Sequence, residues 1–198
     1  MHERIANPEG DDVLARLIRS GIFNERELIL IAENILTAAS DTTANTSTNT
    51  LYALMTNPDQ MALARTNAKA FANLPDEAMR CVSAPPLSGR LTIADLEIRG
   101  IRVPAHSVIL TVLSAANRDP AIFANPHWFD LLRETSSKAV GFGIGPHICL
   151  GQWFAKKVLA ILFDEMFTQC EDIAFDGAPV EPKGIGLRQM PYFKVKVR

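Results

Sequence analysis

An unbroken helical pattern of roughly 30 residues most constrains the fold of this chain, because such a helix would be ~45 Å long. It begins at NERE, where Asn24 and Glu27 have the spacing of a capping box, and it ends at Asn57-Pro58. Apolar or small side chains recur on one face: Leu28, Ile31, Ile35, Ala38 and Thr42. One alternative stays open, because the polar run SDTT at 40–43 could cap a second helix and divide the pattern in two.

Shorter helical patterns surround the long one. Residues 11–21 predict a helix closed by Gly21, and the segments 58–66 and 75–83 each predict a helix with Pro then Asp in its first turn. A further helical pattern follows Cys149, with apolar residues at helical spacing: Ala155, Leu159, Leu162 and Met166. Helices therefore account for most of the predicted structure.

Strand signals are confined to two places. Residues 90–110 alternate, are rich in Ile and Val, and turn at Gly100, which predicts a hairpin and a neighbouring strand. The last residues, 192–198, alternate like an edge strand. The sequence thus predicts a mainly α fold with a small β portion, in a single domain over residues 1–198.

Composition is that of an ordinary globular protein, with 198 residues, 47% hydrophobic and 21% charged, and a net charge of −2. Without Lys/Arg clusters it offers little to nucleic acid. No window approaches the roughly 20 apolar residues of a membrane span, and the first residues lack a signal-peptide core. Cysteines 81, 149 and 170 form no disulfide framework and no CxxC pair, which predicts a cytoplasmic location without structural zinc.

A glycine-rich loop, GFGIGPHICLGQ, leads to Cys149. Gly143, Gly145 and Gly151 stand where a backbone must turn sharply or admit a close neighbour. The helix predicted after Cys149 would favour its thiolate, as a nucleophile or metal ligand. The alternative is a buried cysteine that packs as a small hydrophobe. A dinucleotide loop is excluded, since the stretch has no GxGxxG pattern.

This loop resembles the haem-binding loop of the cytochrome P450 (haem-thiolate monooxygenase) superfamily, bacterial soluble type, which reads Phe-Gly-x-Gly-x-His-x-Cys-x-Gly. Three further segments agree in the same order: AASDTT on the long helix, EAMR on a short helix, and NRDPAIFANPHWFDLLR. The resemblance implies a cytochrome P450-like fold of which this chain covers the C-terminal half. That half contains the long distal helix, the ExxR helix, the meander, the Cys loop and the proximal helix.

The resemblance also implies a cofactor, haem b, with Cys149 as the axial ligand of its iron. It implies that His147 and Arg90 meet the haem propionates; the alternatives are a solvent-facing loop histidine and a surface arginine at a strand edge. Other residues expected at the haem are Phe142, Gly143, Gly151 and Ala38.

An ion pair and a proton relay are implied as well. Glu77 and Arg80 would form a buried pair tied to Arg133; by spacing alone they could equally be an exposed helix pair. Asp41 and Thr42 would be catalytic and deliver protons to bound dioxygen. Ala39 stands where the family usually has Gly, a departure that could narrow the oxygen groove.

The implied function is hydroxylation of an apolar small molecule with O2 and electrons from a ferredoxin or flavin reductase. Lys138, Lys156 and Lys157 could receive an acidic ferredoxin, or could form a solvated helix face. Two other functions stay open: a non-catalytic haem-binding or interaction fragment, and a peroxide-driven peroxygenase, against which the Asp41-Thr42 pair argues. Because the lid and first strands of the family fold have no counterpart in these residues, we expect self-association through the long helix or a completing partner chain.

Overall fold

The computed structural model describes residues 2–198, which form two compact units. The first ends at Asp41 and the second is Thr42–Arg198. That residues 1–198 form a single domain stays a prediction. The helices are α1 (His2–Ala6), α2 (Val13–Ser20), α3 (Glu25–Thr56), α4 (Pro58–Thr66), α5 (Ala68–Cys81), α6 (Leu113–Ala116), α7 (Gln152–Gln169) and the 3-10 helices η1 (Ser136–Lys138) and η2 (Gly145–His147).

Both ends of α2 are capped, and the sequence analysis predicted the cap at Gly21. The Asp12 carboxylate accepts the N–H of Ala15 at 2.9 Å. Gly21 takes φ 67° and donates its N–H to the Ile18 carbonyl, which confirms the predicted helix end.

The long helix α3 is one helix of 32 residues. Its capping box is confirmed: the Glu27 N–H donates to Asn24 Oδ1 at 3.0 Å, and the Asn24 N–H donates to the Glu27 carboxylate at 2.8 Å. The alternative of two helices is wrong. Within the polar run, the Ser40 hydroxyl donates to the Leu36 carbonyl at 2.7 Å, so it bonds back along the helix instead of capping a new one.

The predicted start of the ExxR helix at Pro75 is wrong, because α5 begins seven residues earlier, at Ala68. Asn67 caps it by accepting the Ala70 N–H at 3.0 Å. Pro75 therefore lies inside the helix, where it removes one backbone hydrogen bond. Ala70 and Leu74 are fully buried, and this packing outweighs the local signal of the Pro-Asp pair.

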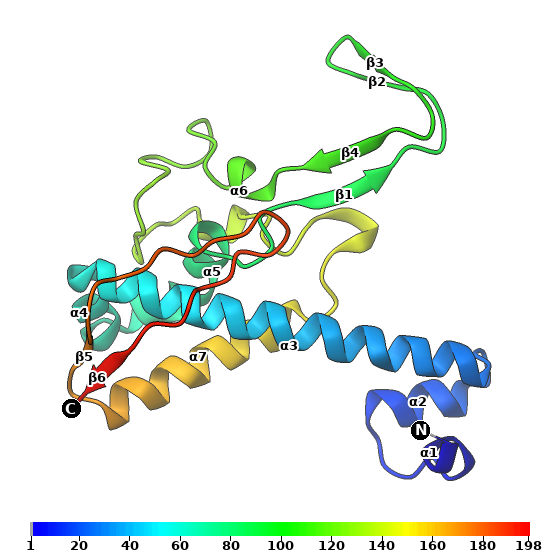
Figure 1. The fold of residues 1–198 in the computed structure, drawn as a ribbon, viewed down its shortest axis with the longest axis horizontal. Coiled ribbons are helices and arrows are strands. Elements are labelled where there is room, and N and C mark those ends of the chain that lie inside the picture. The colour runs from blue at the N-terminus through cyan, green and yellow to red at the C-terminus, as the bar shows by residue number, and fades with distance from the viewer. Residues whose placement is uncertain (1) are drawn as a thin grey trace. The chain divides into compact units, whose positions relative to one another are not determined.

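The core of the second unit lies among α4, α5, α7 and the C-terminal half of α3, which run close together in Figure 1. In α7 the core residues are Leu159 and Phe163, whereas Leu162 of the predicted stripe is partly exposed. The buried cluster consists of Ala53, Leu54, Ala64, Ala70, Leu74, Cys81, Phe129, Leu131, Leu159 and Phe163.

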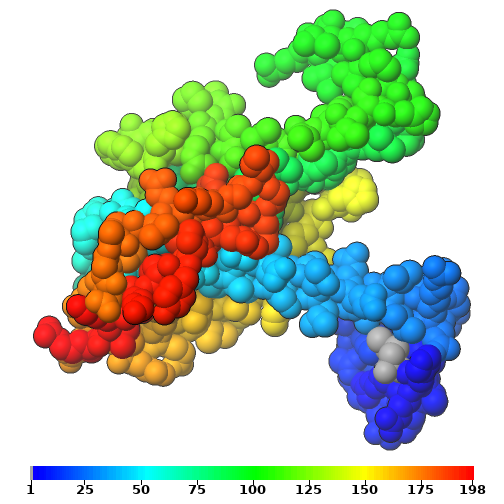
Figure 2. Space-filling model, in the orientation of Figure 1, coloured from blue at the N-terminus to red at the C-terminus, as the bar shows by residue number. Residues whose placement is uncertain are grey.

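Three antiparallel strand pairs make up the β portion: β1 (Ser88–Leu91) with β4 (Val108–Thr111), β2 (Leu96–Ile98) with β3 (Ile101–Val103), and β5 (Ile173–Phe175) with β6 (Val195–Val197). The predicted turn at Gly100 and the C-terminal edge strand are confirmed. The β1–β4 and β2–β3 pairs project from the helices of their unit in Figures 1 and 2. Along residues 2–198, no helix combines the length and apolarity that crossing a membrane requires.

Candidate functional site

A buried ion pair joins Glu77 and Arg80 on α5. Arg80 donates through Nε to Glu77 Oε2 at 2.8 Å and through Nη2 to Oε1 at 2.7 Å, and both side chains have 0% exposure. Arg133 also approaches Glu77, with its Nε 3.3 Å from Oε1. The three side chains, which we call the Glu77 cluster, thus form one charge network in the interior.

Every charged group of the Glu77 cluster has further partners. The Ser136 hydroxyl and the Asp130 N–H donate to the Glu77 carboxylate at 2.8 and 2.9 Å. The remaining guanidinium N–H groups of Arg80 and Arg133 donate to carbonyls of the segment before Arg133: Asn117, Ala124, Asn125, Pro126 and Trp128. These bonds hold that irregular segment against α5.

Arg80 keeps its charge in this interior. Burial alone would lower the pKa of its guanidinium, but the hydrogen bonds and negative charge of Glu77 outweigh burial and raise the pKa overall. A partnered buried charge is tolerated, whereas an unpartnered one is costly.

Asn117 connects the Glu77 cluster to the Cys loop, and the sequence analysis did not identify it. Its fully buried amide donates to the Met79 carbonyl at 3.3 Å and accepts the Val140 N–H at 2.7 Å. The next residue, Gly141, lies so close to α5 that a Cβ there would be 2.5 Å from the Met79 oxygen. The loop therefore begins pressed against the helix that carries the cluster.

The Cys loop turns through two glycines with positive φ, Gly143 at 73° and Gly145 at 76°. The Cys149 N–H donates to the Phe142 carbonyl at 2.9 Å, which closes the loop. The helix α7 begins three residues after the cysteine, with Gly151 as its N-cap. Gly151 has an ordinary φ of −85°, and a Cβ there would lie 4.0 Å from the Cys149 sulfur.

Cys149 is exposed, which excludes the alternative of a buried packing residue within this chain. His147 is exposed on η2, and Phe142 is half-buried. Large apolar side chains of the loop and of the first turn of α7 are exposed too, led by Leu150 at 90%; we call this set the loop apolar residues: Ile144, Ile148, Leu150, Trp153 and Phe154. Large contiguous groups of exposed apolar side chains are typical of binding surfaces.

The other residues expected at the site lie elsewhere. Arg90 is exposed on β1, where Nη1 donates to Ser88 Oγ at 2.6 Å and to the Gly89 carbonyl at 2.7 Å. Over residues 2–198 no ion pair holds it. On α3, Ala38 and Asp41 are exposed and Thr42 is half-buried; Asp41 ends the first unit and Thr42 begins the second.

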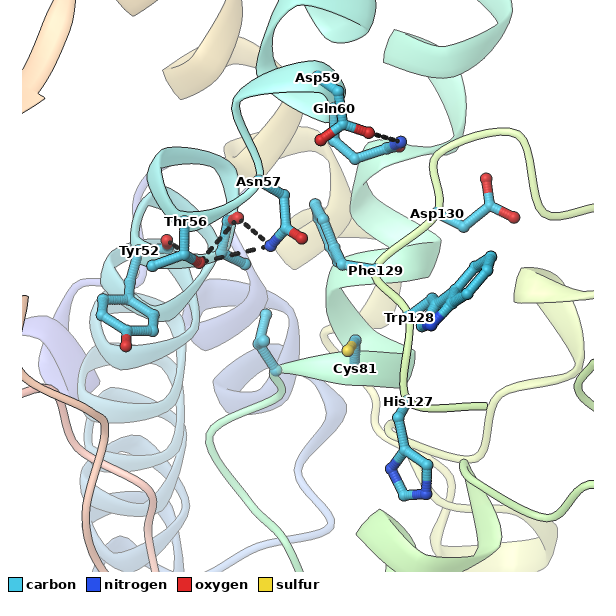
Figure 3. A pocket seen from close by; sticks show the side chains of 12 residues that line it. Tyr52, Thr56, Asn57, Asp59, Gln60, Cys81, His127, Trp128, Phe129 and Asp130 are labelled. Carbon is cyan, nitrogen blue, oxygen red and sulfur yellow. Dashed lines mark hydrogen bonds between the residues drawn. The ribbon is translucent and has the colours of Figure 1, made fainter. Parts of the chain in front are cut away.

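A cavity of about 620 Å³ lies away from these residues, where α3 ends, α4 begins and residues 127–130 pass. In Figure 3, Trp128, Phe129 and Asp130 line one side, while Asn57 lies opposite them on the α3–α4 junction. The Cys81 thiol also lines it, and burial raises the pKa of this thiol although nearby arginines oppose the shift. None of the predicted site residues lines this cavity.

Comparisons with known proteins agree with this geometry. The cytochrome P450 family profile matches residues 7–182. The chain is 36% identical over 159 residues to the 6-deoxyerythronolide B hydroxylase of Saccharopolyspora erythraea, covering 78% of this chain and 39% of that protein. It is 32% identical over 183 residues to the putative cytochrome P450 140 of Mycobacterium tuberculosis, covering 89% of this chain and 42% of that protein.

A solved structure shows the same fold. The haem domain of the Tepidiphilus thermophilus P450 superposes with a TM-score of 0.91 at 22% identity, covering 98% of this chain and 48% of that one. The chain thus spans about half the length, or less, of the proteins it matches. The matched sequence, the fold and the exposed cysteine after its glycine loop lead to one conclusion: the chain belongs to the cytochrome P450 family.

Proposed function

We propose that this chain forms the thiolate side of a haem monooxygenase, with Cys149 as the axial ligand of haem b. The observation that carries the proposal is the exposed sulfur, presented by a loop that its own backbone closes through the Cys149–Phe142 hydrogen bond. Family membership supports a haem monooxygenase in general terms. The ligand, the substrate and the redox partner are our inferences.

The residues around Cys149 suit a flat, largely apolar cofactor with charged edges. Gly143 and Gly151 bring no side chain to the sulfur, and Phe142 and the loop apolar residues offer carbon surface. Exposed His147 and Arg90 are available to bind propionates. When bound, a thiolate-ligated haem supplies activation of dioxygen.

Protons would be delivered by residues of α3. Asp41 carries an exposed carboxylate that can exchange protons with solvent, and the neighbouring Thr42 hydroxyl can both donate and accept a hydrogen bond. We assign Asp41 the uptake of a proton and Thr42 its transfer toward the haem pocket. Electrons would come from a ferredoxin or flavin reductase and the substrate would be an apolar small molecule, with the reaction in the cytoplasm.

Completion of the fold is a second element of the proposal. The loop apolar residues are uncovered in this chain, and the relatives it matches are about twice as long. We infer that full turnover needs the remaining half of the fold, from a continuous segment, a completing partner chain or a second copy. Until it is completed, the chain would bind haem weakly and act as a haem-binding fragment.

Carbon monoxide difference spectroscopy tests the ligand. The reduced, haem-loaded chain should give the red-shifted Soret band of thiolate ligation, because Cys149 presents its sulfur to the iron. Cys149→Ser should abolish this band, whereas Cys170→Ser, a matched control, should keep it. If Cys81→Ser or Cys170→Ser removed the band and Cys149→Ser did not, the assignment of the ligand would be wrong.

A further inference from the structure

A largely shielded ion pair joins α7 to α5 beside the Cys loop. Lys156 Nζ lies 2.5 Å from Asp76 Oδ1, and the two side chains are only 25% and 28% exposed. Asp76 directly precedes Glu77, and Lys156 lies one helical turn into α7. The pair therefore links the helix of the Glu77 cluster to the helix that follows Cys149.

The Lys156 ammonium also faces two aromatic rings. It lies 5.8 Å from the centre of the Phe142 ring and 5.4 Å from the centre of the Trp153 ring, within the range of cation–π attraction. Phe142 is the residue whose carbonyl accepts the Cys149 N–H. One side chain thus contacts α5, α7 and the residue that holds the cysteine backbone.

Packing gives the Cys loop little support at this point. A hollow of about 240 Å³ is bordered by the loop, α5 and α7, and its lining includes Asp76, Met79, Phe142, Ile148 and Lys156. Side chains that border a hollow lose the dispersion contacts of a filled core. The polar contacts of Lys156 therefore carry a larger share of what fixes the loop.

We propose that Lys156 is a positioning residue for Cys149, which holds the loop in its closed conformation through Asp76 and Phe142. The neighbouring Lys157 is exposed and belongs to no ion pair within residues 2–198, so it offers a matched comparison. Asp76 neutralises Lys156, so we remove Lys156 from the expected ferredoxin surface. The exposed lysines that are left for it are Lys138 and Lys157. Lys156 would position the Cys loop with or without haem. Only the importance of this role for catalysis rests on the proposed function.

Amide hydrogen exchange of the whole chain tests the proposal. In Lys156→Met the Cys149 amide should exchange roughly five- to thirtyfold faster, since one shielded pair and two cation–π contacts are lost. Lys157→Met should leave this rate unchanged, and Lys156→Arg should retain the protection. The buried Ala84 amide, which donates to the Thr46 hydroxyl at 3.1 Å, reports whether the fold is intact.

If the single variants lose the fold, exchanging the charges of Asp76 and Lys156 still tests the proposal. The double variant Asp76→Lys with Lys156→Asp restores the ion pair but not the two cation–π contacts, so it should recover part of the Cys149 protection that Lys156→Asp loses. An unchanged rate in Lys156→Met with an intact fold, or no recovery in the double variant, overturns the proposal. If the exchange results hold while Cys149→Ser keeps the thiolate band, the haem ligand assignment fails and the positioning role stands.

Discussion

The Glu77 cluster and the Cys loop belong to the same unit, yet they differ in what completes them. Each charged group in the cluster finds its partners in this chain, and Glu77 and Arg80 are fully buried. In the loop, the cysteine and the loop apolar residues are exposed. The cluster is thus complete in itself, whereas the loop presents exposed groups, for which we propose a ligand or another polypeptide segment.

We expect the cluster to support the loop, and the loop to contribute little to the cluster. Asn117 and Gly141 attach the start of the loop to α5, and the Lys156–Asp76 pair attaches the residues around its end. Damage to the cluster should therefore reach the loop. A change at the exposed cysteine should leave the cluster as it is, because Cys149 contributes little packing.

Removing the centre of the cluster should have the largest effect. In Glu77→Ala, the guanidinium groups of Arg80 and Arg133 remain buried without their anion, and we expect a loss of ~3–5 kcal/mol in the free energy of unfolding. Urea unfolding followed by circular dichroism measures this loss. Cys149→Ser should change the free energy by less than about 0.5 kcal/mol. Equal losses in the two variants would contradict the contrast between the regions.

Adding a methyl group where the loop contacts α5 is expected to cost less. In Gly141→Ala the new methyl group meets the Met79 carbonyl at 2.5 Å, so backbone must shift, and overpacking typically costs ~1–3 kcal/mol. Gly186→Ala is the matched control, because a Cβ there meets nothing within 4 Å. The same urea titration compares them. If both variants had the same midpoint, the contact between Gly141 and α5 would not constrain the loop.

The parts of this fold that local signals determine could be predicted from sequence. The Asn24–Glu27 capping box and the turn at Gly100 depend on neighbouring residues alone, and both are confirmed. The start of α5 could not be predicted, since Pro75 looks like a first-turn residue until the burial of Ala70 and Leu74 is known.

The site residues also divide into those that local sequence reveals and those that depend on distant contacts. The glycine-cysteine motif was visible because its residue types are unusual and closely spaced. Asn117 and Ser136 act through backbone groups and through residues far away in the sequence, so no periodicity or spacing identifies them. Nor could spacing show that Lys156 pairs with Asp76, 80 positions earlier.

Association should be governed by the loop and not by the cluster. Because the loop apolar residues are exposed, we expect the purified chain to self-associate, and light scattering after size exclusion measures its mass. Leu150→Glu combined with Trp153→Glu should shift the population toward monomer. The matched control is Ile185→Glu with Tyr192→Glu, two other exposed apolar positions, which should leave the mass unchanged. A monomeric parent chain would show that the exposed loop does not drive association.

The smallest effect concerns the cysteine that lies next to the cluster. Burial raises the pKa of the Cys81 thiol, so the thiol ionises at lower pH in the unfolded chain than in the folded one. As pH rises above the ordinary thiol pKa of about 8.5, the unfolded state loses this proton first, and the free energy of unfolding falls by at most ~1.4 kcal/mol per pH unit.

This contribution is fully present below the ordinary thiol pKa and is lost above it. Unfolding by urea at several pH values between about 7 and 10 should therefore show a shallower decline in Cys81→Ala than in the parent chain. If stability declined as steeply in Cys81→Ala as in the parent chain, the buried Cys81 thiol would not couple stability to pH.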